Sequence, residues 1–241
     1  MLPFMPRSSR IAPGGVVYHV VNRANGRLRL FRKETDFLAF YNVLLQAQQR
    51  HPIRLLAWCL MSNHWHFVVW PRREGELSRF FGCLGLIHAA RWQVAHDAVG
   101  MGHVYQARFK NFMIQQDAHL LWVLRYVERN PLRAGLVRRA QDWPWSSLYA
   151  RLHGPPPIRE LLSDWPIDRP DDWTAQVNRP QTETELEAIR TATRRGRPLG
   201  SDRWINAAVA QHGLQSTLRP RGRQPGWRKH PAGEDSPPAA K

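Results

Sequence analysis

The sequence predicts an α+β protein with a ferredoxin-like fold, in which an antiparallel sheet carries helices on one face. The first observation is the order of its periodic segments, which run as strand, helix, strand, strand, helix, strand and helix. The second is a two-residue polar connection between apolar runs, which indicates a β-hairpin. The third is composition: 43% of the 241 residues are hydrophobic and 22% are charged, which provides enough apolar side chains for a sizeable core.

The first strand and the first helix follow from local signals. Residues 16–22 (VVYHVVN) are mainly β-branched or aromatic and follow a Pro-Gly-Gly turn, so we expect a strand. Residues 35–50 place apolar side chains close to helical spacing, and Pro52 stops that helix soon afterwards. Residues 54–61 and 64–70 are extended apolar runs that form the predicted hairpin.

The second half of the fold is predicted in the same way. Residues 77–98 are helical in period, and residues 100–106 form a glycine-bearing loop. Residues 109–115 are expected to be a strand. Residues 117–130 begin with an aspartate cap and form a strong helix, which Pro131 is expected to break.

The composition changes near Gly154, where three consecutive prolines follow. Beyond this point we expect short helices at residues 183–194 and 204–212. The last segment is rich in Pro, Gly, Arg and Lys and cannot bury enough apolar surface to order itself. We therefore predict three parts: a principal domain at 1–154, a helical extension at 155–218, and a basic, disordered tail at 219–241.

The charge balance points to a polyanionic partner. Lys and Arg total 35 against 19 Asp and Glu, so the formal net charge is +16. Such a field concentrates nucleic acid around a protein. A codon bias toward arginine explains part of the basic excess, but it does not explain the shortage of acidic residues. We therefore expect nucleic acid binding.

Two further features exclude other classes. The longest uninterrupted apolar run, residues 55–61, is far too short to cross a bilayer, and the basic N-terminus lacks the apolar stretch of a secretory signal. Two cysteines cannot build a disulfide framework or a four-thiolate zinc site. We expect a cytoplasmic protein with no membrane partner.

The segment MSNHWHFVVWP contains the most informative pair of side chains. Alternate residues of a strand share a face, so His64 and His66 point the same way while Trp65 points to the other side. Two imidazoles on one face can bind a single divalent metal ion. Two exposed or hydrogen-bonded histidines without a metal are the alternative, because a His-x-His pattern alone is a weak signal.

The predicted helix at 117–130 supplies further candidates. Its apolar stripe, which should face the sheet, comprises Leu120, Val123, Leu124 and Val127. Tyr126 and Asn130 lie off this stripe and, four residues apart, share a face. A tyrosine beside an amide oxygen that completes a metal site suits phosphodiester cleavage. The alternative is a surface tyrosine and a helix-terminal asparagine.

The motif MSNHWH resembles the HUH motif (histidine, bulky hydrophobe, histidine) of single-tyrosine HUH transposases. Other segments resemble the REP-associated tyrosine transposases of this family, in the same order, and the similarity covers about residues 10–152. These segments are GGVVYHVVNRANGR (14–27), GHVYQARFKN (102–111), LRYVERNPLRAGLV (124–137) and DWPWSSLYA (142–150). Two departures are Ser62, where proline is frequent, and the large central Trp65.

The resemblance implies a site and a reaction. Tyr126 matches the nucleophile, and His64, His66 and Asn130 match the metal ligands of these enzymes. The implied activity is metal-dependent cleavage and rejoining of single-stranded DNA through a 5′-phosphotyrosine intermediate. An open site of nitrogen and oxygen ligands suits Mg²⁺ or Mn²⁺. In this family the targets are repetitive palindromes that fold into hairpins.

Seven side chains are candidates for DNA contacts. We expect five cations to contact phosphate and two aromatic rings to stack on bases, although an arginine in so basic a chain is more often a solvated surface charge. The candidates are Arg23, Arg27, Arg29, Arg108, Lys110, Tyr105 and Trp122.

Two rival functions and one question of assembly stay open. One rival is a replication-initiator or relaxase type of HUH nuclease, which shares the chemistry. The other is a non-catalytic regulator that binds DNA or RNA hairpins. The chain is compatible with either a monomer or a homodimer.

Overall fold

The computed structural model describes residues 11–26 and 28–219. Among the features predicted from the sequence, Arg27 lies outside these residues, as does the tail from residue 220 onward. Across the described helices, none is both long enough and apolar enough to cross a membrane.

Within the described residues, four strands form one antiparallel sheet in the order β2-β3-β1-β4. The predicted hairpin is confirmed: its strands are joined by Ser62 and Asn63. The central position of β1 between β3 and β4 is the arrangement expected of the split βαβ order. The strands are β1 (Val17–Arg23), β2 (Arg54–Met61), β3 (His64–Trp70) and β4 (Lys110–Ile114).

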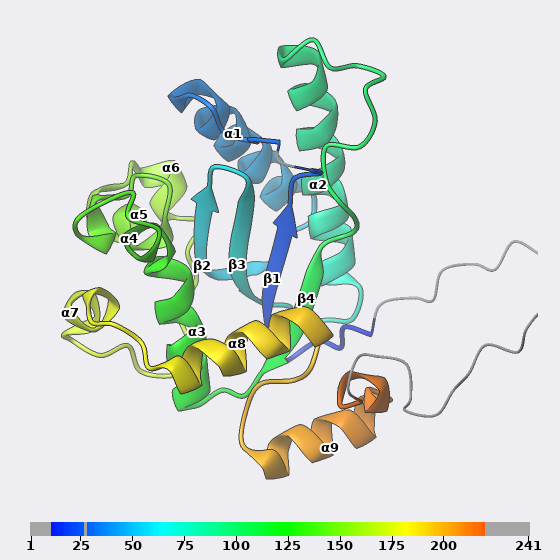
Figure 1. The fold of residues 1–241 in the computed structure, drawn as a ribbon, viewed down its shortest axis with the longest axis vertical. Coiled ribbons are helices and arrows are strands. Elements are labelled where there is room, and N and C mark those ends of the chain that lie inside the picture. The colour runs from blue at the N-terminus through cyan, green and yellow to red at the C-terminus, as the bar shows by residue number, and fades with distance from the viewer. Residues whose placement is uncertain (1–10, 27, 220–241) are drawn as a thin grey trace, which may run out of the picture.

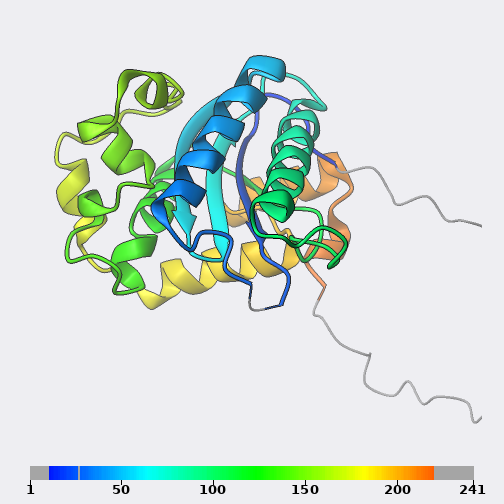
Figure 2. The same ribbon diagram turned by 90° about the horizontal axis from the view of Figure 1, so that it is seen from above.

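One face of the sheet carries the predicted helical layer. Helices α1 (Glu34–Arg50) and α2 (Glu76–Ala95) pack against each other over this face (Figure 2). The core beneath them is largely aromatic, and its fully buried rings include Phe40, Trp58, Trp65, Phe67 and Phe80. We call this side of the sheet the aromatic face. The α+β, ferredoxin-like fold class is confirmed.

Helices also cover the opposite face, in addition to the predicted layer. Helix α3 (Ala118–Glu128) packs against β2 and β3, and α7 (Trp173–Asn178) and α8 (Glu183–Arg195) extend the same core. Figure 1 shows α8 crossing the strands on this side. The predicted apolar stripe of α3 is buried here: Leu120, Val123, Leu124 and Val127 are all 0% exposed. We call this side the histidine face.

Two helix boundaries differ from the sequence prediction for identifiable reasons. Helix α2 ends at Ala95 rather than residue 98, and Asp97 just beyond it has a positive φ of 52°. Pro131 does not end the helical run at Asn130. Instead, α3 ends at Glu128, and a short helix α4 (Asn130–Arg133) begins with Pro131 in its first turn, where a missing N–H costs nothing.

The C-terminal extension is tied to the sheet by backbone hydrogen bonds. Leu199 N–H donates to Met113 O (2.8 Å), and Gln115 N–H donates to Leu199 O (2.9 Å). The predicted helices at 183–194 and 204–212 correspond to α8 and α9 (Asp202–His212). The remaining elements are η1 (Ala140–Asp142), α5 (Ser147–His153), α6 (Pro156–Arg159) and η2 (Gln215–Thr217).

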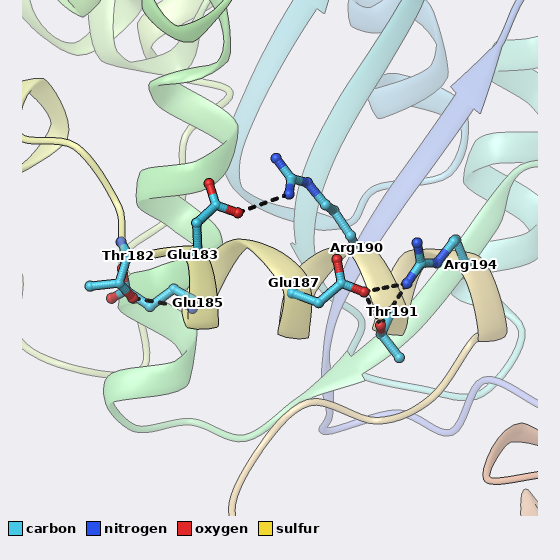
Figure 3. A network of polar contacts seen from close by, with 7 residues as sticks. All are labelled: Thr182, Glu183, Glu185, Glu187, Arg190, Thr191 and Arg194. Carbon is cyan, nitrogen blue, oxygen red and sulfur yellow. Dashed lines mark hydrogen bonds and ion pairs between the residues drawn. The ribbon is translucent and has the colours of Figure 1, made fainter.

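The sequence of α8 explains its stability as a surface helix. Thr182 and Glu185 form a reciprocal capping box at its N-terminus. Along its exposed side, Arg190 pairs with Glu183 and Arg194 pairs with Glu187 (Figure 3). Most charged side chains of α8 therefore form ion pairs with each other, while Ile189 and Ala192 face the core.

Candidate active site

Strand β3 places two imidazoles on the histidine face. His64 and His66 lie on the same side, with ring centroids 4.9 Å apart, while Trp65 is buried in the aromatic face. The shared face predicted from the alternation of strand side chains is confirmed.

Helix α3 brings Tyr126 to the same place. The Tyr126 ring meets the His66 ring edge-to-face, with centroids 5.7 Å apart. Asn130, which follows the helix, is 3% exposed. Residues that are distant in the sequence therefore converge beside the strand that carries the histidines.

Two polar contacts fix the position of α3. The buried carboxylate of Glu128 accepts hydrogen bonds from Ser147 Oγ (2.5 Å) and Trp173 Nε1 (2.7 Å). Burial raises the pKa of Glu128, and these two donors oppose that rise. On the other side, Arg125 forms an ion pair of 2.6 Å with Glu185 of α8. The tyrosine helix is thus held by segments on both sides of it.

The converging side chains line a cavity of about 410 Å³. Its walls combine the predicted tyrosine, histidines and asparagine with cationic side chains, and α8 closes part of it through Thr193. The lining residues that bear on the chemistry are Tyr126, His64, His66, Asn130, Arg23, Arg108, Lys110 and Arg133. A cavity of this composition suits an anionic ligand.

The two histidines are neutral at pH 7. Burial, together with the nearby Arg23 and Arg133, lowers the pKa of His64 to about 4. Burial, followed by the adjacent His64 and His19, holds the pKa of His66 well below its ordinary value. Neutral imidazole is the form that binds metal ions.

The hydrogen bond of His64 fixes which of its nitrogens is free. Its Nδ1 lies 2.7 Å from Asn63 Oδ1, and because an amide oxygen only accepts, His64 donates from Nδ1–H. A neutral imidazole carries one N–H, so the lone pair lies on Nε2. That atom is available to a cation.

Asn130 and Arg133 complete the polar wall. Asn130 Oδ1 accepts a hydrogen bond from Arg133 Nη2 (3.2 Å), and Asn130 Nδ2 is buried with no partner among the described residues. The Arg133 guanidinium also lies 4.5 Å from the centroid of the Tyr126 ring. The guanidinium of Arg133 therefore contacts both Tyr126 and Asn130.

The donor set fits a divalent cation with open positions. Two neutral imidazole nitrogens and one amide oxygen would leave further positions around a divalent cation for water and phosphate oxygens. Across residues 11–26 and 28–219, no cluster of three or more His, Cys, Asp or Glu side chains forms a metal site.

The predicted DNA contacts divide into two groups. Arg23, Arg108 and Lys110 line the cavity. Arg29 is exposed and does not line it, and Trp122 is half-buried against the ring of His119. The positions of these five side chains do not test DNA binding, so their contacts with DNA stay predictions.

Tyr105 packs between the loop and the aromatic face. Its hydroxyl accepts from Trp65 Nε1 (3.0 Å) and lies 2.7 Å from His88 Nδ1, and burial raises its pKa. Its hydroxyl is therefore engaged within the protein, and base stacking by its ring remains a prediction.

Sequence reasoning did not select two residues of this region, Arg133 and Thr193, and for a third, His19, it favoured packing or a hydrogen bond over a role near the metal. His19 is 0% exposed and its Nε2 lies 2.9 Å from His66 Nδ1. Its position on the first strand, two residues from Val17 on the same face, was the available signal. The position of Arg133, one helical turn beyond Arg129 and close to Asn130 in the sequence, also indicated that it could lie near the site. No local sequence pattern indicated that Thr193 would do so.

Comparison with known proteins agrees with this geometry. Residues 14–130 match the family model described as "Transposase IS200 like". The chain is 26% identical over 141 residues to the REP-associated tyrosine transposase of Escherichia coli (strain K12), covering 56% of this chain and 78% of the relative. A solved structure of a REP-associated tyrosine transposase bound to a REP hairpin matches with a TM-score of 0.51 at 20% identity, covering 69% of this chain and 94% of the other. At that identity the structural match shows the fold. The family match identifies residues 14–130 as an IS200-like transposase domain, and the chain is similar to the REP-associated tyrosine transposases.

Proposed function

We propose that this transposase cleaves and rejoins single-stranded DNA, with the Tyr126 hydroxyl as the nucleophile. Attack of Oη on the scissile phosphorus forms a 5′-phosphotyrosine link and breaks the bond to the 3′-oxygen, which leaves as a hydroxyl. The phenol gives its proton to solvent, and the departing 3′-oxygen takes up a proton from solvent. Attack by a 3′-hydroxyl of another strand reverses these changes and rejoins DNA without ATP.

The observation that carries this proposal is the convergence of Tyr126, His64, His66 and Asn130 on one cationic cavity. A nucleic acid binder that does no chemistry has no need of a tyrosine beside two neutral imidazoles. If these side chains served only to pack the core, arginines and a lysine would not line the same cavity.

A divalent cation, Mg²⁺ or Mn²⁺, would be held by His64 Nε2, by His66 and by Asn130 Oδ1. When bound, the cation polarises the scissile phosphate and neutralises the negative charge that develops on it. His64 is prepared for this role by its hydrogen bond to Asn63 Oδ1. Asn130 is prepared by its burial, which restricts its amide.

The chain's own cations would orient the strand. Arg133 lies over Tyr126 and would stabilise negative charge on the phenol oxygen and on the phosphate. Arg23, Arg108 and Lys110 would contact the phosphates that flank the cleavage point, because their side chains line the same cavity. A single strand suits the site, since an exposed backbone is needed for in-line attack from a helix-borne tyrosine.

The substrate we propose is a DNA hairpin formed by a repetitive palindrome, with an unpaired flank that enters the cavity. The solved structure of a REP-associated tyrosine transposase bound to a REP hairpin supports this choice. The formal net charge of +16 supports nucleic acid binding over a larger surface than the cavity alone.

The test is incubation of the full chain with a labelled single-stranded hairpin and Mn²⁺, followed by denaturing electrophoresis. We expect a protein–DNA adduct that survives denaturation and is absent in Tyr126→Phe. Tyr149→Phe is the matched control, because Tyr149 packs beside His153 and does not line the cavity. Hairpin binding by the wild type without any adduct would instead support a non-catalytic regulator.

A further inference from the structure

We propose that His19 is a positioning residue that orients His66 for metal binding, an inference that rests on the metal site proposed above. His19 is 0% exposed, and its Nε2 lies 2.9 Å from His66 Nδ1. It lines no part of the cavity and would not touch the DNA or the cation. Its hydrogen bond to the site is to His66, and its ring also approaches the Tyr126 ring edge-to-face, with centroids 6.3 Å apart.

The strand register brings the two rings together. On β1, His19 pairs with Val68 of β3, while His66 pairs with Val21, so the two histidines are diagonal neighbours on one face. The His19 ring lies against Phe112 of β4, with centroids 4.9 Å apart, and against His66 at 5.0 Å. Packing from both sides therefore fixes the orientation of His19.

The position of the proton on His66 decides whether this residue can bind a cation. If Nδ1–H of His66 donates to His19 Nε2, the lone pair of His66 lies on Nε2 and is free. If His19 donates instead, the proton of His66 lies on Nε2 and blocks the cation. Cation binding therefore requires His19 to act as the acceptor.

His19 then has the same relation to His66 that Asn63 has to His64. Asn63 Oδ1 accepts from His64 Nδ1 at 2.7 Å. Metal-binding histidines commonly donate their second N–H to such a partner, which fixes both the tautomer and the ring. The other nitrogen of His19, Nδ1, is buried without a partner within the described part of the chain, so the contact to His66 is the one hydrogen bond that its ring makes there.

The experiment measures Mn²⁺ affinity by calorimetry in the full chain. His19→Phe keeps a ring of similar shape but removes the acceptor, and we expect the Kd for Mn²⁺ to rise about 10- to 100-fold. His19→Gln can place an amide oxygen near the former Nε2, and we expect it to restore most of the affinity. His88→Phe is the matched control, because His88 is also a buried, hydrogen-bonded histidine but lies on the aromatic face.

Two further readouts separate positioning from a structural role. In ¹⁵N NMR of the Mg²⁺-loaded protein, we expect the proton of His66 on Nδ1 in the wild type and loss of this single tautomer in His19→Phe. Adduct formation by His19→Phe should recover toward the wild-type rate as Mn²⁺ is raised to saturation. Circular dichroism establishes that each variant is folded.

The outcomes distinguish this inference from the proposed function. Equal Mn²⁺ affinity in wild type and folded His19→Phe overturns the role of His19 and leaves the proposed function standing. Equal losses in His19→Phe, His19→Gln and His88→Phe also overturn it, because they indicate general destabilisation. Absence of Mn²⁺ binding by the wild type overturns the metal site and this inference together.

Discussion

The two faces of one sheet have different composition, although the same strands build both. On the aromatic face, β3 contributes Trp65, Phe67 and Val69, which are all buried among apolar side chains under α1 and α2. On the histidine face, the same strand contributes His64 and His66 at one end and Val68 further along. Along β3, one face is packed with apolar side chains, whereas the other divides into a packed part and a cavity.

The difference shows how this fold separates stability from chemistry. The aromatic face buries large rings that hold the sheet and its two helices together. The apolar part of the histidine face anchors α3, and this anchoring sets the position of Tyr126. The side chains that line the cavity are largely polar, so they contribute little buried apolar surface to the stability of the fold. Substitutions on the two faces should therefore have separable effects.

The largest effect on stability is expected for Phe67→Ala. Phe67 is 0% exposed, and removal of a buried aromatic ring costs about 3–5 kcal/mol in the free energy of unfolding. Urea denaturation measures this loss. Adduct formation per folded molecule should be retained, because Phe67 points away from the cavity. A loss below about 1 kcal/mol would contradict the role assigned to the aromatic face.

The converse effect is expected for His64→Ala, three residues away on the same strand. His64 is half-buried at the edge of the cavity, so the free energy of unfolding should change by less than about 1 kcal/mol. Adduct formation with Mn²⁺ should fall about 100-fold or more, because the variant lacks one of the proposed metal ligands. Wild-type rates of adduct formation would place the chemistry elsewhere.

A smaller effect is expected for Arg133→Met, which removes the cation over the Tyr126 ring. We expect the loss of about 2 kcal/mol of interaction, which is roughly 30-fold in the rate of adduct formation. Arg139→Met is the matched control, because Arg139 forms an exposed ion pair with Asp142. If both variants lose the same activity, the guanidinium of Arg133 has no specific role.

The smallest effect is a change in pH dependence for His88→Phe on the aromatic face. Burial lowers the pKa of His88 from 6.5 to about 3, so between these values the unfolded chain binds a proton that the folded chain does not. Folded wild type therefore loses stability as the pH falls below 6.5. His88→Phe should reduce the loss of stability between pH 7 and pH 5 by about 2 kcal/mol, measured by denaturation at these two pH values. An unchanged loss would show that His88 is not buried in its neutral form.

Much of this arrangement was predictable from local sequence patterns. The β-hairpin and the alternation of its side chains placed His64 and His66 on one face. The period of α3 placed its apolar stripe on the sheet. The motif resemblance added Tyr126 and Asn130 to the same site, and the structure brings all four to one cavity.

The rest depends on tertiary contacts that periodicity does not contain. The partner of His66 is set by the register of β1 against β3, which cannot be read from either strand alone. The approach of Thr193 to the cavity depends on α8, whose position is set by Arg125–Glu185 and by the backbone of Leu199. The continuation of the helical run past Asn130 depends on Pro131 occupying a first turn, where it is tolerated.

The central claim, that one cation is bound by side chains from β3 and from the segment after α3, is tested most directly by pulsed EPR of Mn²⁺ bound to the full chain. We expect nitrogen couplings from two histidines in the wild type, and from one in His64→Ala. Replacing Asn130 with alanine should weaken Mn²⁺ binding while keeping both nitrogen couplings. A spectrum with no histidine nitrogen in the wild type would contradict the account.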